Sequence, residues 1–159
     1  GSYHPVDLWM PGIGDQCDLH AETARPGSAS PVPADFDRDA YGARVRADLS
    51  GLDEVPTTKA PYQEFAPIID TFLKEHLFAD IFDRDILDYR QRELVTVSVL
   101  TTIGGVEPML RSHMNICLIQ GITPIQLKEL TDVVGRNVDQ EKIDSAKKVL
   151  NELLESKKQ

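Results

Sequence analysis

The sequence predicts an all-α protein, a compact helical bundle with a central helical hairpin that follows an irregular N-terminal arm. From residue 36 onward, apolar residues recur three and four positions apart, which is the spacing of one face of an α-helix. Prolines, glycines and capping residues divide this pattern into segments of helical length. No pair of these segments has the pattern of a β-hairpin. We therefore expect five or six helices.

Residues 1–35 differ in composition from the rest of the chain. They are rich in proline and glycine and lack apolar periodicity, and "ARPGSASPVPADFD" is typical of a linker. We therefore divide the chain into an arm, residues 1–35, and one helical domain, residues 36–159. The arm segment "VDLWMPGI" contains Trp9, the single tryptophan. We expect this apolar segment to pack on protein, with a solvated tail as the alternative.

The first part of the domain predicts two helices. The segment "DRDAYGARVRADL", residues 37–49, predicts a short one. The segment "YQEFAPIIDTFLKEHLFADIF", residues 62–82, predicts a longer one that Pro67 shifts or kinks. The apolar stripe of the longer helix consists of Phe65, Ile68, Ile69, Phe72, Leu73 and Leu77.

The segment "DYRQRELVTVSVLTTI", residues 88–103, is apolar nearly all the way round. Its β-branched residues also suit a buried strand. Its length, a capping box formed by Asp88 and Gln91, and the stop signal of Gly104 and Gly105 favour a helix instead.

Three further helices follow the glycine pair. Pro108 suits the first turn of a helix over residues 107–120, and Gly121 suits its end. Thr123 begins the next helix with the same capping pattern, and Asp139 precedes the last one. The apolar stripe of the last helix consists of Ile143, Ala146, Val149, Leu150 and Leu153.

Charge and cysteine content limit the classes of function. The formal net charge of −9 disfavours non-specific binding to nucleic acid or to an anionic membrane. No run approaches the roughly 18 apolar residues of a membrane span. We expect a cytoplasmic protein and leave open a leader that has been removed. Cys17 and Cys117 fit no CxxC or zinc-ligand spacing, so we expect two free thiols, with Cys117 as a small core residue.

Glu93 and His113 are the strongest candidates for catalytic residues. The helices over 88–103 and 107–120 are joined by two glycines, so they are expected to form an antiparallel hairpin. Glu93 lies eleven residues before the first glycine, and His113 lies eight residues after the second. At about 1.5 Å rise per residue, these levels differ by roughly 4–5 Å, which is less than one turn. A carboxylate can therefore meet an imidazole across the hairpin and orient it for acid–base chemistry.

Each candidate residue also has a structural interpretation. Glu93 is favoured near a helix N-terminus by the helix dipole. His113, one turn from Met109 and one turn from Cys117, can be a satisfied core histidine. His76 would complete a candidate pocket with Met109 and Cys117, and it is the one residue that could add a third metal ligand. We predict no metal site.

The stretches "RELVTVS", "GGVEPMLRSHMN" and "GITPIQLKE" closely resemble the carboxymuconolactone decarboxylase family, within the alkylhydroperoxidase D-like superfamily. The resemblance covers residues 60–135. It implies the compact all-helical fold of the alkylhydroperoxidase D-like type, assembled as a homotrimer or homohexamer with sites near subunit contacts.

The peroxidase branch of this superfamily has a CxxC pair whose second cysteine lies four residues before the site histidine. When His113 is aligned with that histidine, Val106 and Met109 occupy the two cysteine positions. The CxxC is therefore absent, and Cys117 lies on the wrong side of His113 to replace it. A thiol-dependent peroxidase or reductase is disfavoured.

The decarboxylase branch implies a lyase that acts on a small lactone dicarboxylate in aromatic compound catabolism, without a cofactor. His113 would donate the proton, and Glu93 would support it. Arg111 is a candidate substrate-binding residue because a guanidinium can hold a carboxylate with two parallel hydrogen bonds. The alternative for Arg111 is an ion pair with Glu107, one turn away.

Three hypotheses therefore remain. The first is a 4-carboxymuconolactone decarboxylase-like enzyme, or a related acid–base enzyme, acting on a small carboxylated lactone or ring. The second is the thiol-dependent peroxidase or reductase. The third is a non-catalytic oligomeric module whose polar residues hold subunits together.

Overall fold

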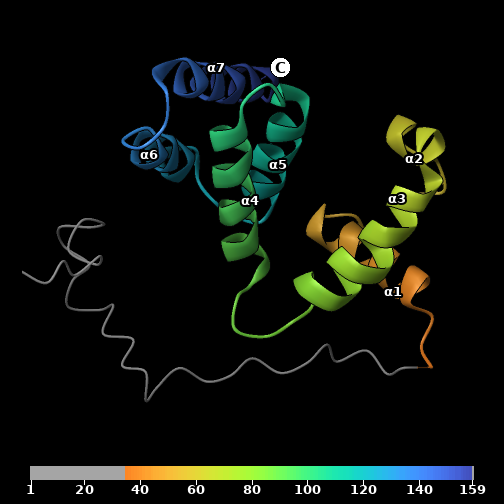
Figure 1. The fold of residues 1–159 in the computed structure, drawn as a ribbon. Helices are drawn as coiled ribbons and strands as arrows, with labels where there is room; N and C mark the ends of the chain where they lie inside the picture. Colours follow the sequence, from red (N-terminus) through yellow and green to blue (C-terminus); the bar gives the residue numbers. More distant parts are fainter. Residues whose placement is uncertain (1–34, 159) are drawn as a thin grey trace, which may run out of the picture.

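The computed structural model describes residues 35–158, and in this part of the chain every regular element is helical (Figure 1). The predicted all-α class is confirmed. No helix among these residues is long and apolar enough to cross a membrane. Trp9 and Cys17 lie outside the described residues, so the expectations for the arm stay predictions. In chain order, the elements are α1 (Arg38–Leu49), α2 (Pro61–Phe65), α3 (Pro67–Phe72), the π-helix η1 (Leu73–Phe82), α4 (Tyr89–Ile103), α5 (Glu107–Ile119), α6 (Pro124–Val134) and α7 (Gln140–Ser156).

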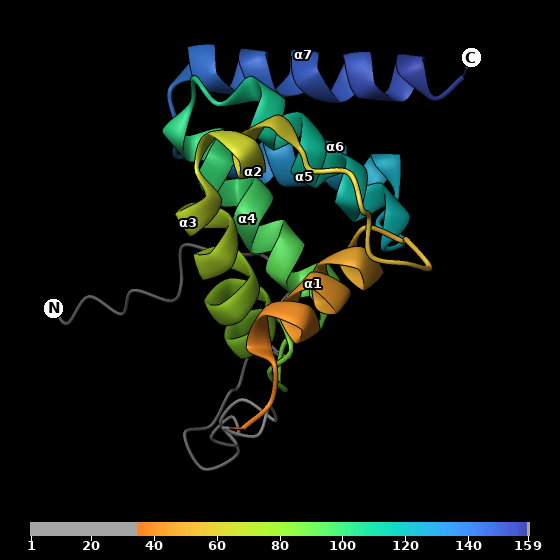
Figure 2. The same ribbon diagram turned by 90° about the vertical axis from the view of Figure 1, so that its right-hand side faces the viewer.

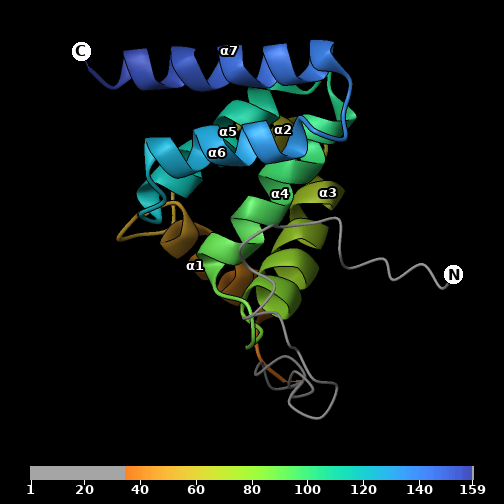
Figure 3. The same ribbon diagram turned by 90° about the vertical axis from the view of Figure 1, so that its left-hand side faces the viewer.

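The helices α4 to α7 form one lobe around the main apolar core. In this lobe α4 and α5 lie side by side, and α7 crosses one end of the pair (Figures 1 and 2). Figure 3 shows α6 beneath α7, and α6 packs against α4 and α7. The core consists of Val97, Leu100, Leu110, Met114, Cys117, Ile122, Leu127, Ala146, Val149, Leu150 and Leu153. The predicted apolar stripe of the last helix is buried in full, as expected.

The hairpin of α4 and α5 begins and turns where the sequence predicts. The Asp88 carboxylate accepts a hydrogen bond from the Gln91 backbone at 2.8 Å, and the Gln91 side chain accepts one from the Asp88 backbone at 2.9 Å. Gly104 and Gly105 have φ angles of 71° and 70°, which L side chains rarely adopt. The capping box and the glycine pair therefore fix both ends of α4.

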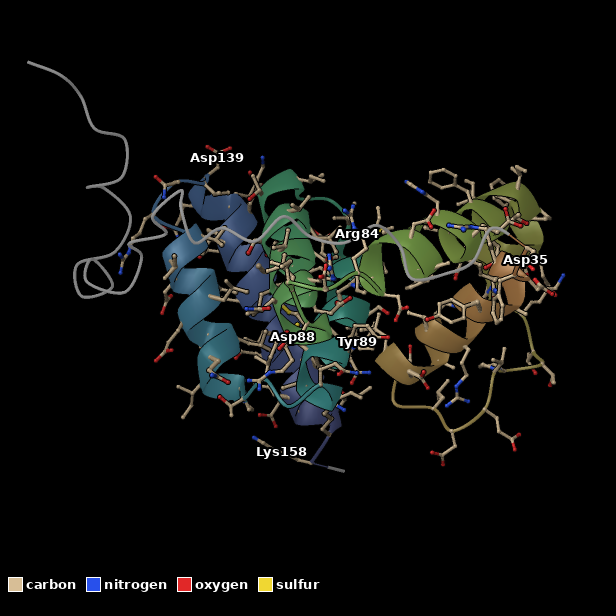
Figure 4. All side chains as sticks on the ribbon, turned by 90° about the horizontal axis from the view of Figure 1, so that it is seen from below. Asp35, Arg84, Asp88, Tyr89, Asp139 and Lys158 are labelled. Atoms are coloured by element: carbon tan, nitrogen blue, oxygen red, sulfur yellow. The ribbon has the colours of Figure 1, made fainter. Side chains whose placement is uncertain are left out.

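The helices α1 to η1 form a second lobe that meets the first at the start of α4. Val45, Leu49 and Phe82 pack together here, with Tyr89 of α4 and Ile116 of α5 against them. Tyr89 lies between the two lobes in Figure 4. The lobes therefore share a small apolar contact.

The predicted helix over 62–82 is divided into three pieces. It breaks at Ala66, directly before Pro67, in agreement with the expected kink. Its last ten residues form the π-helix η1, which the sequence did not predict. Asp70 is the one buried residue of α3. Its carboxylate faces inward because it accepts hydrogen bonds from Arg46 of α1 at 2.7 Å and from Gln63 at 2.8 Å. This polar contact turns much of the apolar stripe toward solvent, and the exposed members are Phe65, Ile68, Ile69 and Phe72.

Candidate functional site

Glu93 of α4 and His113 of α5 are in direct contact. Nδ1 of His113 lies 2.8 Å from Oε2 of Glu93. The Glu93 side chain is completely buried, whereas the His113 side chain is 27% exposed. The predicted meeting of a carboxylate and an imidazole across the hairpin is therefore confirmed, with the carboxylate inside and the imidazole at the surface.

The hydrogen bond defines which imidazole nitrogen is available for chemistry. When Glu93 is ionised, its carboxylate can only accept, and Nδ1 of His113 is then the donor. This leaves Nε2 as the nitrogen that can exchange a proton with a bound molecule. The second oxygen of Glu93, Oε1, is buried and has no hydrogen-bond partner among the described residues. The imidazole is therefore the polar group that this carboxylate contacts.

The pair lies beside the junction of the two lobes. Tyr89 precedes Glu93 by one turn of α4, and Ile116 follows His113 by three residues on α5. Both of these neighbours pack against the second lobe, which consists of α1 to η1. The partly exposed imidazole therefore lies near the contact between the two lobes.

Cys117 lies one turn after His113 and is completely buried in the core. Burial, and then the charge of Glu93, raise the pKa of the Cys117 thiol to about 12. The thiol is therefore uncharged near neutral pH, which makes it a poor nucleophile and a poor metal ligand. Met109, one turn before His113, is exposed. Cys117 is a core residue, as the sequence predicts.

His76 is held elsewhere, on η1. Its Nδ1 lies 3.3 Å from an Asp80 oxygen, and its ring is tilted against Phe72 at a centroid distance of 5.2 Å. Neither contact involves Glu93 or His113. Among residues 35–158, no group of three or more His, Cys, Asp or Glu side chains is arranged to hold a metal ion.

Arg111 faces a different side of α5 from His113. Residues two positions apart in an α-helix, such as Arg111 and His113, are separated by about 200° around its axis. The guanidinium Nη2 of Arg111 donates to Oγ of Ser156 at 2.9 Å, at the end of α7. Glu107, its alternative partner, accepts a hydrogen bond from Ser145 at 2.8 Å instead. Within one chain, the structure therefore brings Glu93 and His113 together and directs Arg111 toward α7.

A surface cavity of about 370 Å³ surrounds Arg111. Its polar lining residues are Arg111, Ser112, Asn115, Ser156 and Lys157. Of these residues, only Arg111 is indicated as a binding residue by the sequence. The spacing of Arg111 and Asn115 by four residues is a signal for a shared helix face. The two residues of α7 are far away in the sequence and give no such signal.

Comparisons with known proteins agree with the resemblance found in the sequence. Residues 67–152, from the start of α3 into α7, match the model of the carboxymuconolactone decarboxylase family. The chain is 30% identical over 96 residues to a 4-carboxymuconolactone decarboxylase of Acinetobacter baylyi, a match that covers 60% of this chain and 71% of the relative. No solved structure gives a significant match. The protein whose Glu93 and His113 meet across this hairpin belongs to the carboxymuconolactone decarboxylase family.

Proposed function

We propose that this protein is a cofactor-independent decarboxylase that acts on a small carboxylated lactone or ring, with His113 and Glu93 as its acid–base unit. The observation that carries the proposal is the 2.8 Å contact between Nδ1 of His113 and a fully buried carboxylate oxygen of Glu93. The curated relative from Acinetobacter baylyi, a 4-carboxymuconolactone decarboxylase, supports the reaction class.

The proposed reaction needs one proton and a place for one electron pair. The bond between the substrate carboxylate carbon and the ring breaks, and CO₂ leaves without the bonding electrons. These electrons delocalise into the conjugated lactone carbonyl as a dienolate. The His113 imidazolium then donates its Nε2 proton to the ring carbon, while the Glu93 carboxylate stabilises the cationic ring through Nδ1. Solvent returns the proton to Nε2 for the next turnover.

The burial of Glu93 argues against a purely structural role for the pair. Removing a carboxylate from water costs several kcal/mol, and well-packed apolar residues often give equal or greater stability at such a position. Oε1 of Glu93 also lacks a hydrogen-bond partner among the described residues. An arrangement with this cost is expected where the charge is needed for chemistry.

The thiol-dependent alternative receives less support. Val106 and Met109 stand where the peroxidase branch has cysteines. Cys117 is buried, and its raised pKa keeps it protonated at neutral pH. We therefore place the chemistry on the imidazole.

We also propose that the protein assembles as a homotrimer or a homohexamer. Two helices expose more apolar surface than a monomer normally leaves in water. Phe65 at the end of α2 and Ile68 on α3 are 91% and 77% exposed, and Val95 and Val99 on α4 are 58% and 50% exposed.

A substrate screen tests the proposed reaction. The protein is incubated with carboxylated lactones and aromatic-pathway acids, and products are detected by mass spectrometry together with released CO₂. Turnover by the native protein, and its loss in a His113→Ala variant, would support the proposal. Turnover of a hydroperoxide with a dithiol donor, in place of any decarboxylation, would contradict it.

A further inference from the structure

We propose that the cavity around Arg111 is a second ligand site, which binds a small carboxylate with an apolar body on the side of α5 away from the acid–base pair. The site, here called the α5–α7 cavity, has Arg111, Ser112 and Asn115 on one wall and Ser156 and Lys157 on the other. It does not depend on the proposed decarboxylation, because it shares no residue with the pair of Glu93 and His113.

The first argument is charge. Arg111 and Lys157 form no ion pair with any described residue, although the chain as a whole has a net charge of −9. Glu107 is engaged by Ser145 at 2.8 Å, and Glu155 is engaged by Lys158 at 2.6 Å. No acidic side chain lines the cavity. Two positive charges therefore face one concave surface without a counter-charge, and an anionic ligand would supply it.

The second argument is geometry. Oγ of Ser156 donates to the Leu153 carbonyl at 2.7 Å and accepts from Arg111 at 2.9 Å. This chain of two hydrogen bonds fixes one side of the guanidinium and leaves its remaining N–H groups for a ligand. An arginine held in place loses little entropy when it binds a carboxylate with two parallel bonds. The hydroxyl of Ser112 and the amide of Asn115 add further hydrogen-bonding groups to the wall.

The third argument concerns the body of the ligand. Lys157 also lines a neighbouring cavity of about 620 Å³. Its apolar lining residues are Leu118, Ile119, Pro124 and Leu154, and its polar ones besides Lys157 are Lys128, Asn151, Glu155 and Lys158. A ligand whose carboxylate reaches Arg111 can therefore extend an apolar body past Lys157 toward these apolar side chains. Pockets of such volumes, with a few fixed polar groups, are typical of small-molecule sites.

Benzoate is a suitable probe, and acetate and inorganic phosphate are its comparisons. The full chain is labelled with ¹⁵N and titrated with each anion at constant ionic strength, and amide shifts are followed by NMR. We expect saturable shifts in residues 108–115 and 153–158 with benzoate, and weaker binding of acetate and phosphate. Shifts spread evenly over the lysines of the surface, or equal affinity for all three anions, would overturn the proposal.

Variants locate the binding. Arg111→Ala should weaken benzoate binding about tenfold or more, because hydrogen bonds to a charged group are lost. Arg136→Ala is the matched control, since Arg136 is exposed at the end of α6 and makes no ion pair among the described residues. It should leave the affinity unchanged. Equal losses in both variants would contradict the site.

Two further variants keep the test decisive. Arg111→Lys retains a positive charge and the packing of the stem but removes the planar fork, so it should weaken binding severalfold even if Arg111→Ala does not fold. His113→Ala should bind benzoate with native affinity. Loss of binding in His113→Ala would place the carboxylate at the acid–base pair and would overturn the second site.

Discussion

Nδ1 of His113 lies 2.8 Å from Oε2 of Glu93, and the carboxylate is shut off from solvent while the imidazole reaches the surface. This asymmetry separates two tasks. In the proposed mechanism, the buried carboxylate orients the ring and compensates the charge of the imidazolium, and Nε2, which is not bonded to Glu93, acts on the substrate. The same contact in a fully exposed pair would be weakened by water and by competing rotamers.

Substitutions at the pair should affect turnover far more than they affect folding. Once a substrate is identified, His113→Ala should lower kcat by about 10²–10⁴-fold, which is the usual contribution of a positioned acid or base. Glu93→Gln keeps the size of the side chain but cannot compensate the imidazolium charge, so it should also lower kcat. Steady-state kinetics, with circular dichroism as the measure of folding, checks both results.

Glu129→Gln provides the matched control for Glu93→Gln. Glu129 is exposed on α6, so the same loss of a carboxylate there should leave kcat unchanged. A His113→Ala protein that retains full turnover would remove the imidazole from the mechanism.

Cys117 should be inert in the folded protein. Its pKa is raised to about 12 by burial and by the charge of Glu93, so near neutral pH the thiol is protonated as well as inaccessible. In a Cys17→Ser background, iodoacetamide at neutral pH should not modify Cys117 until denaturant unfolds the chain. Cys117→Ser should retain turnover and lose about 1–3 kcal/mol of unfolding free energy, the cost of a buried hydroxyl. Rapid alkylation of the native protein would revive the thiol hypothesis.

The contact between Glu93 and His113 could be predicted from the sequence because the prediction needs few assumptions. Two helices with clear caps are joined by a glycine pair, so the rise per residue alone sets the levels of the two side chains. The sequence also indicates that Arg111 and His113 lie on different sides of α5, because residues two positions apart in a helix are rotated by about 200°. The same angle places the Arg111 guanidinium on the α7 side of α5, where it contacts Ser156.

The second lobe, which consists of α1 to η1, was less predictable. Helical spacing over residues 62–82 indicates an apolar face but not which face is buried. In the structure, Asp70 turns inward to Arg46, a residue 24 positions earlier, and no local pattern reports such a contact. The residue composition of η1 likewise does not distinguish a π-helix from an α-helix.

The Asp70 contact predicts a loss of stability in acid. Burial alone raises the pKa of the Asp70 carboxyl, but hydrogen bonds from Arg46, Gln63 and Lys74 outweigh it, so the pKa lies below its ordinary value of 3.8. The contribution of a carboxyl with a lowered pKa is fully present above pH 3.8 and is lost as the pH falls through the folded-state pKa. Thermal unfolding followed from about pH 6 to about pH 3 measures it.

Asp70→Asn isolates this contribution. The variant should be less stable than the native chain by about 1.5–3 kcal/mol at neutral pH, because hydrogen bonds to a charged group are lost. The difference should shrink in acid, where the native Asp70 also becomes neutral. A difference that stays constant across the whole pH range would assign the loss to packing and not to the charge.

The exposed apolar face of α3 should be an assembly surface. Light scattering at micromolar concentration is expected to give the mass of a trimer or a hexamer. Ile68→Asp should reduce that mass, because a charge would be buried at the contact without a partner. Ile125→Asp is the control, since Ile125 on α6 is 68% exposed but lies outside the α3 and α4 faces. A monomeric native protein would rule out the proposed assembly.

Gly42 should tolerate no side chain in the second lobe. It is buried in α1, where alanine would ordinarily favour the helix by about 1 kcal/mol. A Cβ at this position, however, would overlap the carbonyl oxygen and Cα of Lys74 in η1. These are backbone atoms, so α1 and η1 would have to separate, and the ion pairs of Lys74 with Asp39 and Asp70 would be strained. Gly42→Ala should therefore lower the free energy of unfolding by about 1–3 kcal/mol, as measured by urea unfolding. An increase in stability would show that the two helices pack less closely than the structure has them.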